Sequence, residues 1–416
     1  MNHLYAFEHP TNVDVALNIF LQAIEHQHLK SELRPIIESM GRILAEDVTV
    51  KQDIPSFDRS VVDGFAVRSA DIRNASLHNP TVLRVIGESK LGQKCSINLG
   101  RSNAIAVATG SIVPRGGDSV VPKENIVNVS EQRISITLPI GRGQNILRKG
   151  EDFSRGKVIL DRGRRLRPED LGLLKVLGFT RVRVLQQPRV GVMSTGSELV
   201  ERVGQSCLGA KTVDINRTIL SAMVSACDGK VVDFGIVSDD RVSIIHALRK
   251  AIRSCNLILV SGGSSVGQRD LVPGCVNALG RPGMLVHGVA MRPAMPTGLA
   301  AVNNVPIIVL PGFPVSAMFA FLVFGQPMIA KIIGTKNMIE RTTKAILTET
   351  VKGGRGYRTF VRIKLRRIKG RFVAKPLKNQ RSSALASMVA ADAYLVIPED
   401  ANEIRANKTV QVTMLR

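Results

Sequence analysis

Three polar loops of the sequence carry residue types that could bind and transform a charged ligand. The richest is Ser261–Asp270, which reads Ser-Gly-Gly-Ser-Ser-Val-Gly-Gln-Arg-Asp between an apolar run and a segment of helical apolar spacing. This pattern predicts a strand, a loop and a helix. Glycines without a Cβ let backbone N–H groups close on the oxygen atoms of a phosphate or another oxyanion. On its own, such a loop is equally typical of a tight turn between a strand and a helix.

Asp270 ends this loop and has two chemical interpretations. Its carboxylate could cap the following helix, or it could hold a divalent metal ion near a bound phosphate. The sequence leaves both interpretations open.

The other two loops, Ser194–Glu198 and Pro311–Ser316, lie in the same region of the chain. Residues 188–334 alternate apolar strand patterns with helical patterns, which is typical of a doubly wound α/β domain. In such folds ligands bind beyond the carboxyl ends of the strands. We therefore expect the three loops to meet at one edge of a parallel sheet.

The flanking regions have different patterns. Residues 11–50 show helical spacing in two segments, the second of them over Ser39–Asp47, and helical spacing returns at Pro168–Leu177. Short alternating apolar runs between about 80 and 145 predict a small β domain inserted into that helical part. From residue 343 onward the alternation again predicts strands, arranged as a small barrel or sandwich.

Composition limits the classes of protein. The chain has 416 residues, 44% of them hydrophobic, which is enough for about two to four domains. No stretch reaches the roughly 18 uninterrupted apolar residues of a membrane span, and the first residues lack a signal-peptide pattern. The odd number of cysteines and the absence of a CxxC pair favour free thiols. We expect a soluble, cytoplasmic protein that does not act at a membrane.

The net charge of +23 raises the question of an anionic partner. Basic residues cluster at Arg162–Arg167 and Arg355–Arg371, and the second cluster alternates with apolar residues as in a strand with one solvated face. No RNA-recognition, zinc-finger or clear helix-turn-helix motif accompanies them. A solvated basic face is favoured over nucleic-acid binding.

Taken together, several motifs resemble in order and spacing those of the MoeA and gephyrin E-domain family, over essentially the whole chain. They are Phe57–Val67, Thr109-Gly110, Gly150–Asp152, Ser194–Leu199, Asp214–Arg217, Ser261–Asp270, Arg292–Pro296, Pro311–Ala317 and Asn379–Met388. The resemblance implies a metal-dependent molybdopterin molybdenumtransferase. Such an enzyme inserts molybdate or tungstate into adenylylated molybdopterin with release of AMP.

The resemblance also implies an architecture and partners. The expected parts are a discontinuous helical linker domain (1–52 and 146–187), an inserted β domain (53–145), a molybdopterin-binding α/β domain (188–335) and a C-terminal β barrel (336–416). The expected assembly is a homodimer, and a molybdopterin adenylyltransferase and molybdoenzyme apoproteins are possible partners.

Site residues follow from the same resemblance, position by position. The expected catalytic carboxylates are Asp270, Glu198, Asp63, Asp152 and Asp214; Asp270 and Glu198 would hold Mg²⁺, and Asp63 and Asp152 would act from the other subunit. The expected molybdopterin-binding residues are Thr109, Ser194, Thr195, Gly196, Gly262, Gly263, Ser264, Ser265, Gly267, Pro311 and Gly312. The expected oxyanion-binding residues are Arg292, Pro296, Ser316, Arg362 and Ser383, since molybdate is a dianion that needs cations and hydroxyl or amide donors.

The sequence departs from the family pattern at the oxyanion residues. Where the family typically reads Lys-Pro-Gly-Lys-Pro or Arg-Pro-Gly-Lys-Pro, this chain has Ala294 and Met295. Loss of a charged hydrogen bond costs about 1.5 to 3 kcal/mol, and Ala restricts a turn that Gly would allow. Phe313 and Arg59 each replace an Asn. These changes leave open a molybdopterin-binding carrier that inserts no metal, and a scaffold or nucleic-acid-binding protein.

Overall fold

The computed structural model describes residues 9–25, 27–130, 132–202, 211–263, 271–335 and 341–415. By the contacts among its residues the chain divides into two compact units. The first unit is Met1–Glu32 with Leu185–Arg416, and the second is Leu33–Val184. The finer division into domains at residues 52, 145, 187 and 335 stays a prediction.

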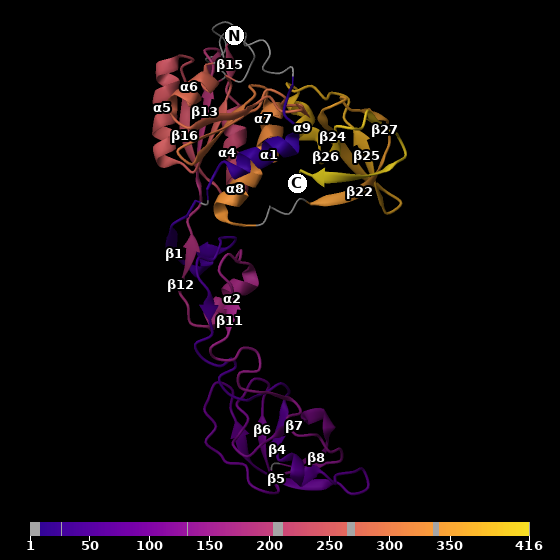
Figure 1. Cartoon of the computed structure of the whole chain (residues 1–416). Helices are drawn as coiled ribbons and strands as arrows, with labels where there is room; N and C mark the ends of the chain where they lie inside the picture. The colour runs from indigo at the N-terminus through magenta and orange to yellow at the C-terminus, as the bar shows by residue number, and fades with distance from the viewer. Residues whose placement is uncertain are drawn as a thin grey trace. The chain divides into compact units, whose positions relative to one another are not determined.

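The first unit contains an α/β sheet with strand order β16-β13-β17-β21-β20-β18 (Figure 1). The first four strands are parallel to their neighbours, and β20 and β18 are antiparallel. The bounds are β13 Arg189–Thr195, β16 Lys230–Val237, β17 Leu257–Ser261, β18 Pro282–His287, β20 Gly298–Val302 and β21 Val305–Leu310. This is the doubly wound α/β arrangement that the sequence predicts.

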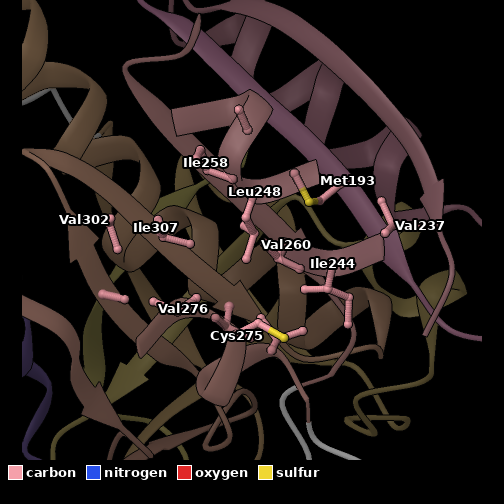
Figure 2. Close-up of a cluster of buried hydrophobic side chains, with 14 of the residues drawn as sticks. Met193, Val237, Ile244, Leu248, Ile258, Val260, Cys275, Val276, Val302 and Ile307 are labelled. Carbon is pink, nitrogen blue, oxygen red and sulfur yellow. The ribbon is translucent and has the colours of Figure 1, made fainter. Parts of the chain in front are cut away.

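Helices cover both faces of this sheet. Helices α5 (Arg241–Ser254) and α6 (Val272–Leu279) pack on one face, where Ile258 and Val260 of β17 join Leu248 and Val276 in a buried cluster (Figure 2). Helices α4 (Asn216–Ala226) and α1 (Val13–Gln22) contact the strands as well. Every residue of β17 is buried, which is typical of a central strand of a parallel sheet.

The longest apolar helix of this unit runs from Pro314 to Ile333 without a break. It comprises α7 (Pro314–Ala320), a π-helical turn (Phe321–Gly325) and α8 (Gln326–Ile333). Its length and composition would allow it to cross a membrane, but 67% of its most apolar stretch is buried inside the protein. We therefore interpret it as a core helix.

The same unit ends in a closed β barrel with strand order β24-β25-β22-β28-β26, closed by pairing of β24 with β26. The bounds are β22 Thr342–Leu347, β24 Arg358–Ile368, β25 Arg371–Pro376, β26 Ala393–Ile397 and β28 Thr409–Met414; the short strands β23 Val351–Lys352 and β27 Glu403–Ile404 pair beside it, and helix α9 spans Leu385–Ala390. The predicted C-terminal barrel is confirmed.

The barrel packs directly on the α/β sheet part. Strand β19 (Met291–Arg292) pairs with the start of β24. The rings of Phe319, Phe360 and Tyr394 pack together, with centroids 5.0 to 5.9 Å apart. These aromatic contacts fix α7 against the barrel strands that flank the candidate site.

The second unit is mainly β. Its largest sheet has the order β7-β4-β6-β5-β9-β8. The bounds are β1 Ser31–Pro35, β2 Val48–Thr49, β3 Arg59–Ser60, β4 Gly64–Val67, β5 Thr81–Ser89, β6 Asn103–Val107, β7 Ser119–Pro122, β8 Ile126–Ser130, β9 Arg133–Ile136, β10 Ile146–Leu147, β11 Val158–Leu160, α2 Pro168–Val176 and β12 Arg181–Leu185.

The prediction of helical segments is only partly right. Helices α1 and α2 form where helical spacing predicts them, and Asn12 caps α1 by accepting from the N–H groups of Asp14 and Val15. The second predicted helix, over Ser39–Asp47, is wrong: a 3₁₀ turn ends at Ser39 and a turn at Gly41 with φ +74° follows. A backbone at that φ leaves the helical region, so the apolar spacing beyond it belongs to extended chain.

Candidate functional site

The three polar loops of the sequence follow adjacent strands of the parallel sheet. Strands β13, β17 and β21 lie side by side, and Ser194 is in register with Ser261, which is in register with Leu310. From β13 the chain passes to β16 on one side and then crosses to β17 on the other. Such a reversal opens a crevice at the carboxyl ends of the strands.

A cavity of about 700 Å³ lies at this crevice, and we call it the rim cavity. Its lining combines loop residues with uncharged walls and two carboxylates: Thr195, Glu198, Leu199, Thr212, Val213, Asp214, Ile215, Asn216, Ser261, Gly262, Met295, Pro296, Pro311, Gly312, Phe313 and Pro314. Thr195, Gly262, Pro311 and Gly312 were expected to bind molybdopterin. The cavity therefore gathers residues from all three loops.

Gly262 is required by the shape of the central loop. Its φ is +96°, and an added Cβ would collide with the carbonyl oxygen of Thr195. Gly196 has a similar role in the first loop, because an added Cβ would lie 2.6 Å from Oε1 of Glu198. Because Gly262 has no side chain, its loop packs closely against Thr195 in the neighbouring loop. Because Gly196 has none, the Glu198 carboxylate lies close to the backbone of position 196.

Asn216 ties the three elements around the rim cavity together. Its Nδ2 donates to Oγ of Ser261 at 2.7 Å and to the carbonyl oxygen of Gly312 at 2.8 Å. Its buried Oδ1 and the buried Oγ of Ser194 have no hydrogen-bond partner within the described residues. Buried polar atoms of this kind usually find a partner, and of the two residues Asn216 lines the rim cavity.

The two described carboxylates of the rim cavity differ in their partners. Asp214 is 8% exposed, and its Oδ2 lies 3.3 Å from Nε of Arg217, which also pairs with Glu201 and Asp233. Glu198 lines the cavity. Over the residues that the structure describes, no group of three or more His, Cys, Asp or Glu side chains could hold a metal ion. Asp270, together with Ser264, Ser265 and Gly267, lies outside the described residues.

A second cavity of about 480 Å³ adjoins the first, and we call it the barrel cavity. It is lined by Arg292, Pro293, Ala294, Pro296, Pro311, Phe313, Ser316, Lys352, Thr359, Phe360, Val361, Gln380 and Ser382. Pro296, Pro311 and Phe313 line both cavities. A ligand in one cavity would therefore lie next to a ligand in the other.

Arg292 supplies positive charge to the barrel cavity. Its guanidinium carbon lies 4.3 Å from the centroid of the Tyr357 ring, a cation–π geometry that orients the side chain. Gly354 makes room for it, because an added Cβ there would lie 2.9 Å from Nη1 of Arg292. The side chain of Arg292, a predicted oxyanion-binding residue, is thus held in place by its packing on Tyr357 and Gly354.

Arg362 lies behind the loop that lines the barrel cavity. The side chain is fully buried, and its Nη2 donates to the carbonyl oxygens of Asn379 and Arg381, each at 3.2 Å. Its Nε and Nη1 have no hydrogen-bond partner among the described residues. Burial lowers the pKa of the Arg362 guanidinium to about 10. A buried cation without a carboxylate is costly, so its position favours an anionic ligand.

The other predicted oxyanion residues occupy different positions around the barrel cavity. Ser316 and Pro296 line it, whereas Ser383 is exposed and its neighbour Ser382 lines the wall. Ala294 lines the barrel cavity with φ +85°, and Met295 lines the rim cavity. Neighbouring residues of this motif therefore contribute to different cavities.

Three of the predicted site residues lie in the second unit. The Oδ1 atom of Asp63 accepts hydrogen bonds from the backbone N–H of Thr109 at 2.7 Å and from its hydroxyl at 2.9 Å. The backbone bond and then the hydroxyl bond lower the pKa of Asp63. Asp152 is exposed. Asp63 and Thr109 thus form one local pair, in which the carboxylate stays charged.

Comparison with known proteins identifies the family. Three family models match in sequence: the MoeA N-terminal region (domain I and II) over residues 11–178, a probable molybdopterin binding domain over 191–331, and the MoeA C-terminal region (domain IV) over 344–415. The chain belongs to the MoeA family. The resemblance seen in the sequence motifs is confirmed.

Individual relatives agree with this assignment. The molybdopterin molybdenumtransferase of Bacillus subtilis is 31% identical over 91% of this chain and 88% of its own length. That of Haemophilus influenzae is 30% identical over 92% and 93%. The crystal structure of the molybdopterin biosynthesis protein MoeA from Pyrococcus horikoshii OT3 superposes with a TM-score of 0.84 at 33% identity, covering 97% of this chain and all of that one.

Some residues of the site were not predicted from the sequence. Asn216 belongs to a motif of the family but was not assigned a role, and its hydrogen bonds span 45 and 96 residues. Phe313 was noted only as a substitution, yet it is 57% exposed and lines both cavities. The signal in the sequence for Phe313 was an aromatic residue directly after Pro-Gly at the end of an apolar strand pattern.

Proposed function

We propose that this protein is a molybdopterin molybdenumtransferase that inserts molybdenum into the dithiolene of molybdopterin during molybdenum cofactor biosynthesis. The MoeA family membership and the transferases among its relatives support this function. They do not favour the alternative of a carrier or scaffold that inserts no metal.

One structural observation carries the proposal: two cavities of different charge share a wall. The rim cavity offers glycine loops, hydroxyls and a buried amide, which suit a phosphorylated pterin. The barrel cavity offers Arg292, and the buried Arg362 lies behind its 379–381 loop; positive charge of this kind suits a tetrahedral dianion. Pro296, Pro311 and Phe313 line both cavities. An oxyanion bound in the barrel cavity would therefore lie next to a pterin bound in the rim cavity.

The finer chemistry is part of the proposal. Adenylylated molybdopterin is the substrate, AMP is the leaving group, and the transferred metal comes from molybdate or tungstate. Glu198 and Asp270 would hold Mg²⁺, an ion that prefers one or two carboxylates and keeps several waters. When bound, that ion would neutralise charge on the phosphoanhydride. The charge of Asp214 is already neutralised by Arg217, so Asp214 would position the residues around it in the wall of the rim cavity.

The assembly is also proposed. In a homodimer, Asp63 and Asp152 of the second unit would act on the site of the partner subunit, and the Thr109 hydrogen bonds would keep Asp63 charged there. The protein would act in the cytoplasm, where it would receive substrate from a molybdopterin adenylyltransferase and deliver cofactor to molybdoenzyme apoproteins.

The direct test is AMP release and cofactor formation from adenylylated molybdopterin with magnesium, while molybdate and tungstate are titrated. We expect turnover with at least one oxyanion and no turnover with Glu198→Gln. A protein that binds the pterin but forms neither AMP nor cofactor would contradict the transferase function. A Met295→Lys variant tested beside it shows whether the missing family lysine limits the rate.

The dimer is tested by mixing two inactive variants. Asp63→Asn and Asp214→Asn subunits, inactive alone, should regain part of the wild-type rate when they are combined, because each mixed dimer contains one intact composite site. Absence of recovery in verified mixed dimers would show that both carboxylates act within one subunit.

A further inference from the structure

The charge of the barrel cavity comes from two of the residues that line it. Among these described lining residues only Arg292 and Lys352 are charged, and none is a carboxylate. Lys352 lies outside all the sequence motifs that resemble those of the MoeA family. Its presence doubles the positive charge of the residues that line the cavity, and the two positive charges together would balance the two negative charges of a dianion.

The backbone after Lys352 packs against Arg292. Lys352 ends strand β23, and Gly353 and Gly354 follow. The Gly354 position lies against the Arg292 guanidinium, which stacks on Tyr357 three residues later. Because the N–H of Gly354 donates to Oγ1 of Thr359, another residue of the cavity wall, this turn is fixed to the cavity.

Lys352 is not neutralised by a neighbouring acid. Its cross-strand neighbour is Glu403 on β27, which instead pairs with Arg405, with Nε and Oε1 3.1 Å apart. No ion pair of Lys352 occurs within the described residues. A flexible ammonium without an acidic partner at a cavity wall is available to an anionic ligand.

Other cations of this region are less suited to contact a ligand directly. Arg362 is fully buried and already donates to two backbone carbonyls of the 379–381 loop. Position 295, where the family pattern has a lysine, holds Met295, and this residue lines the rim cavity. The second point charge of the barrel cavity is therefore that of Lys352.

We propose that Lys352 is an oxyanion-binding residue. Its ammonium and the Arg292 guanidinium both contact the tetrahedral dianion, and Arg362 supplies positive charge from behind the loop. The inference rests on the proposed function, because it assigns a residue to the oxyanion of that same reaction.

The test is equilibrium dialysis of molybdate and of tungstate against the full-length protein. Lys352→Gln should weaken binding about ten- to a hundredfold, the effect of losing a charged hydrogen bond. Lys352→Arg should restore most of the affinity, which a merely structural loss would not do. The matched control is Lys344→Gln, an exposed lysine of barrel strand β22 away from both cavities, and it should bind like wild type.

Two further readouts separate the failure modes. If Lys352→Gln binds both oxyanions as tightly as wild type, while wild type releases AMP, the role of Lys352 is wrong and the transferase function stands. If wild type binds neither oxyanion and releases no AMP, the proposed function fails and the role of Lys352 fails with it. Pterin binding by Lys352→Gln should be unchanged, since Lys352 does not line the rim cavity.

Discussion

The two cavities of the site are built on opposite principles. The rim cavity is formed by backbone: glycines that permit close turns and an asparagine that fastens one loop to two others. The barrel cavity is formed by cationic side chains placed on or behind strand pairs. A large, partly apolar ligand suits a cavity defined by shape and many donors, whereas a small dianion suits one defined by charge. Under the proposed function, one cavity would recognise its ligand by shape and the other by charge, with Pro296, Pro311 and Phe313 between them.

The largest expected effect comes from removing charge behind the barrel cavity. Arg362→Met should lower metal insertion about a hundredfold, the upper end of the effect expected for one charged interaction, because it removes the buried positive charge behind the 379–381 loop. The free energy of unfolding should fall by about 1–3 kcal/mol, because the carbonyl oxygens of Asn379 and Arg381 lose the donor that pairs with them. Cofactor formation and urea unfolding are the two measurements.

Arg366→Met is the matched control for that experiment. Arg366 is exposed on the same strand as Arg362, so its replacement should leave insertion near the wild-type rate. If the rate of cofactor formation by Arg362→Met depended on molybdate concentration as it does in wild type, the charge of Arg362 would not contribute to the barrel cavity. The proposed contrast between the two cavities would then be wrong.

The rim cavity should respond instead to added bulk. Gly262→Ala forces a side chain onto a backbone with φ +96° and against the Thr195 carbonyl, so the free energy of unfolding should fall by about 1–3 kcal/mol. The KM for the pterin substrate should rise, while molybdate binding stays unchanged. Urea unfolding and steady-state kinetics measure these effects.

Gly312→Ala is the paired variant in the same cavity. No atom lies within 4 Å of a Cβ added at Gly312, so the free energy of unfolding should change by less than about 0.5 kcal/mol. Equal destabilisation by both substitutions would mean that backbone conformation at position 262 is not what shapes the rim cavity.

The difference between the cavities also decides what the sequence could predict. Rim-cavity loops follow buried strands, and glycines mark their turns, so both the strands and the meeting of the loops were predictable from local pattern. The charge of the barrel cavity depends on which strands pair. Strand β19, for example, pairs with β24, which lies far from it in the sequence. Arg362 lies on β24, which also pairs with β26, and Lys352 lies on β23, which pairs with β27; no local pattern indicates these pairings.

The errors of sequence interpretation have similar causes. Spacing over Ser39–Asp47 fits a helix, but a turn at Gly41 sends the chain into extended structure. Asn216 fastens loops whose strands become neighbours only through the order of the sheet. In each case tertiary contacts decide what a local pattern leaves open.

The smallest expected effect lies where the two cavities meet. Ala294 is 3% exposed and has φ +85°, a conformation that favours glycine. Ala294→Gly should raise the free energy of unfolding by up to about 1 kcal/mol, since relief of strain exceeds the greater freedom of glycine in the unfolded chain. Its carbonyl should still accept from Oγ1 of Thr297, now at 2.7 Å, so the turn is kept. The midpoint of urea unfolding measures the change.

Asn407→Gly is the reference for this substitution. Asn407 has φ +64° in a turn of the barrel, but asparagine tolerates that conformation better than alanine, so replacing it should stabilise less. If Ala294→Gly raised stability and also tightened molybdate binding, strain at position 294 in the wall of the barrel cavity would limit oxyanion binding directly. If it raised stability alone, the loss of glycine at this position affects folding, and oxyanion affinity is set by the cationic side chains.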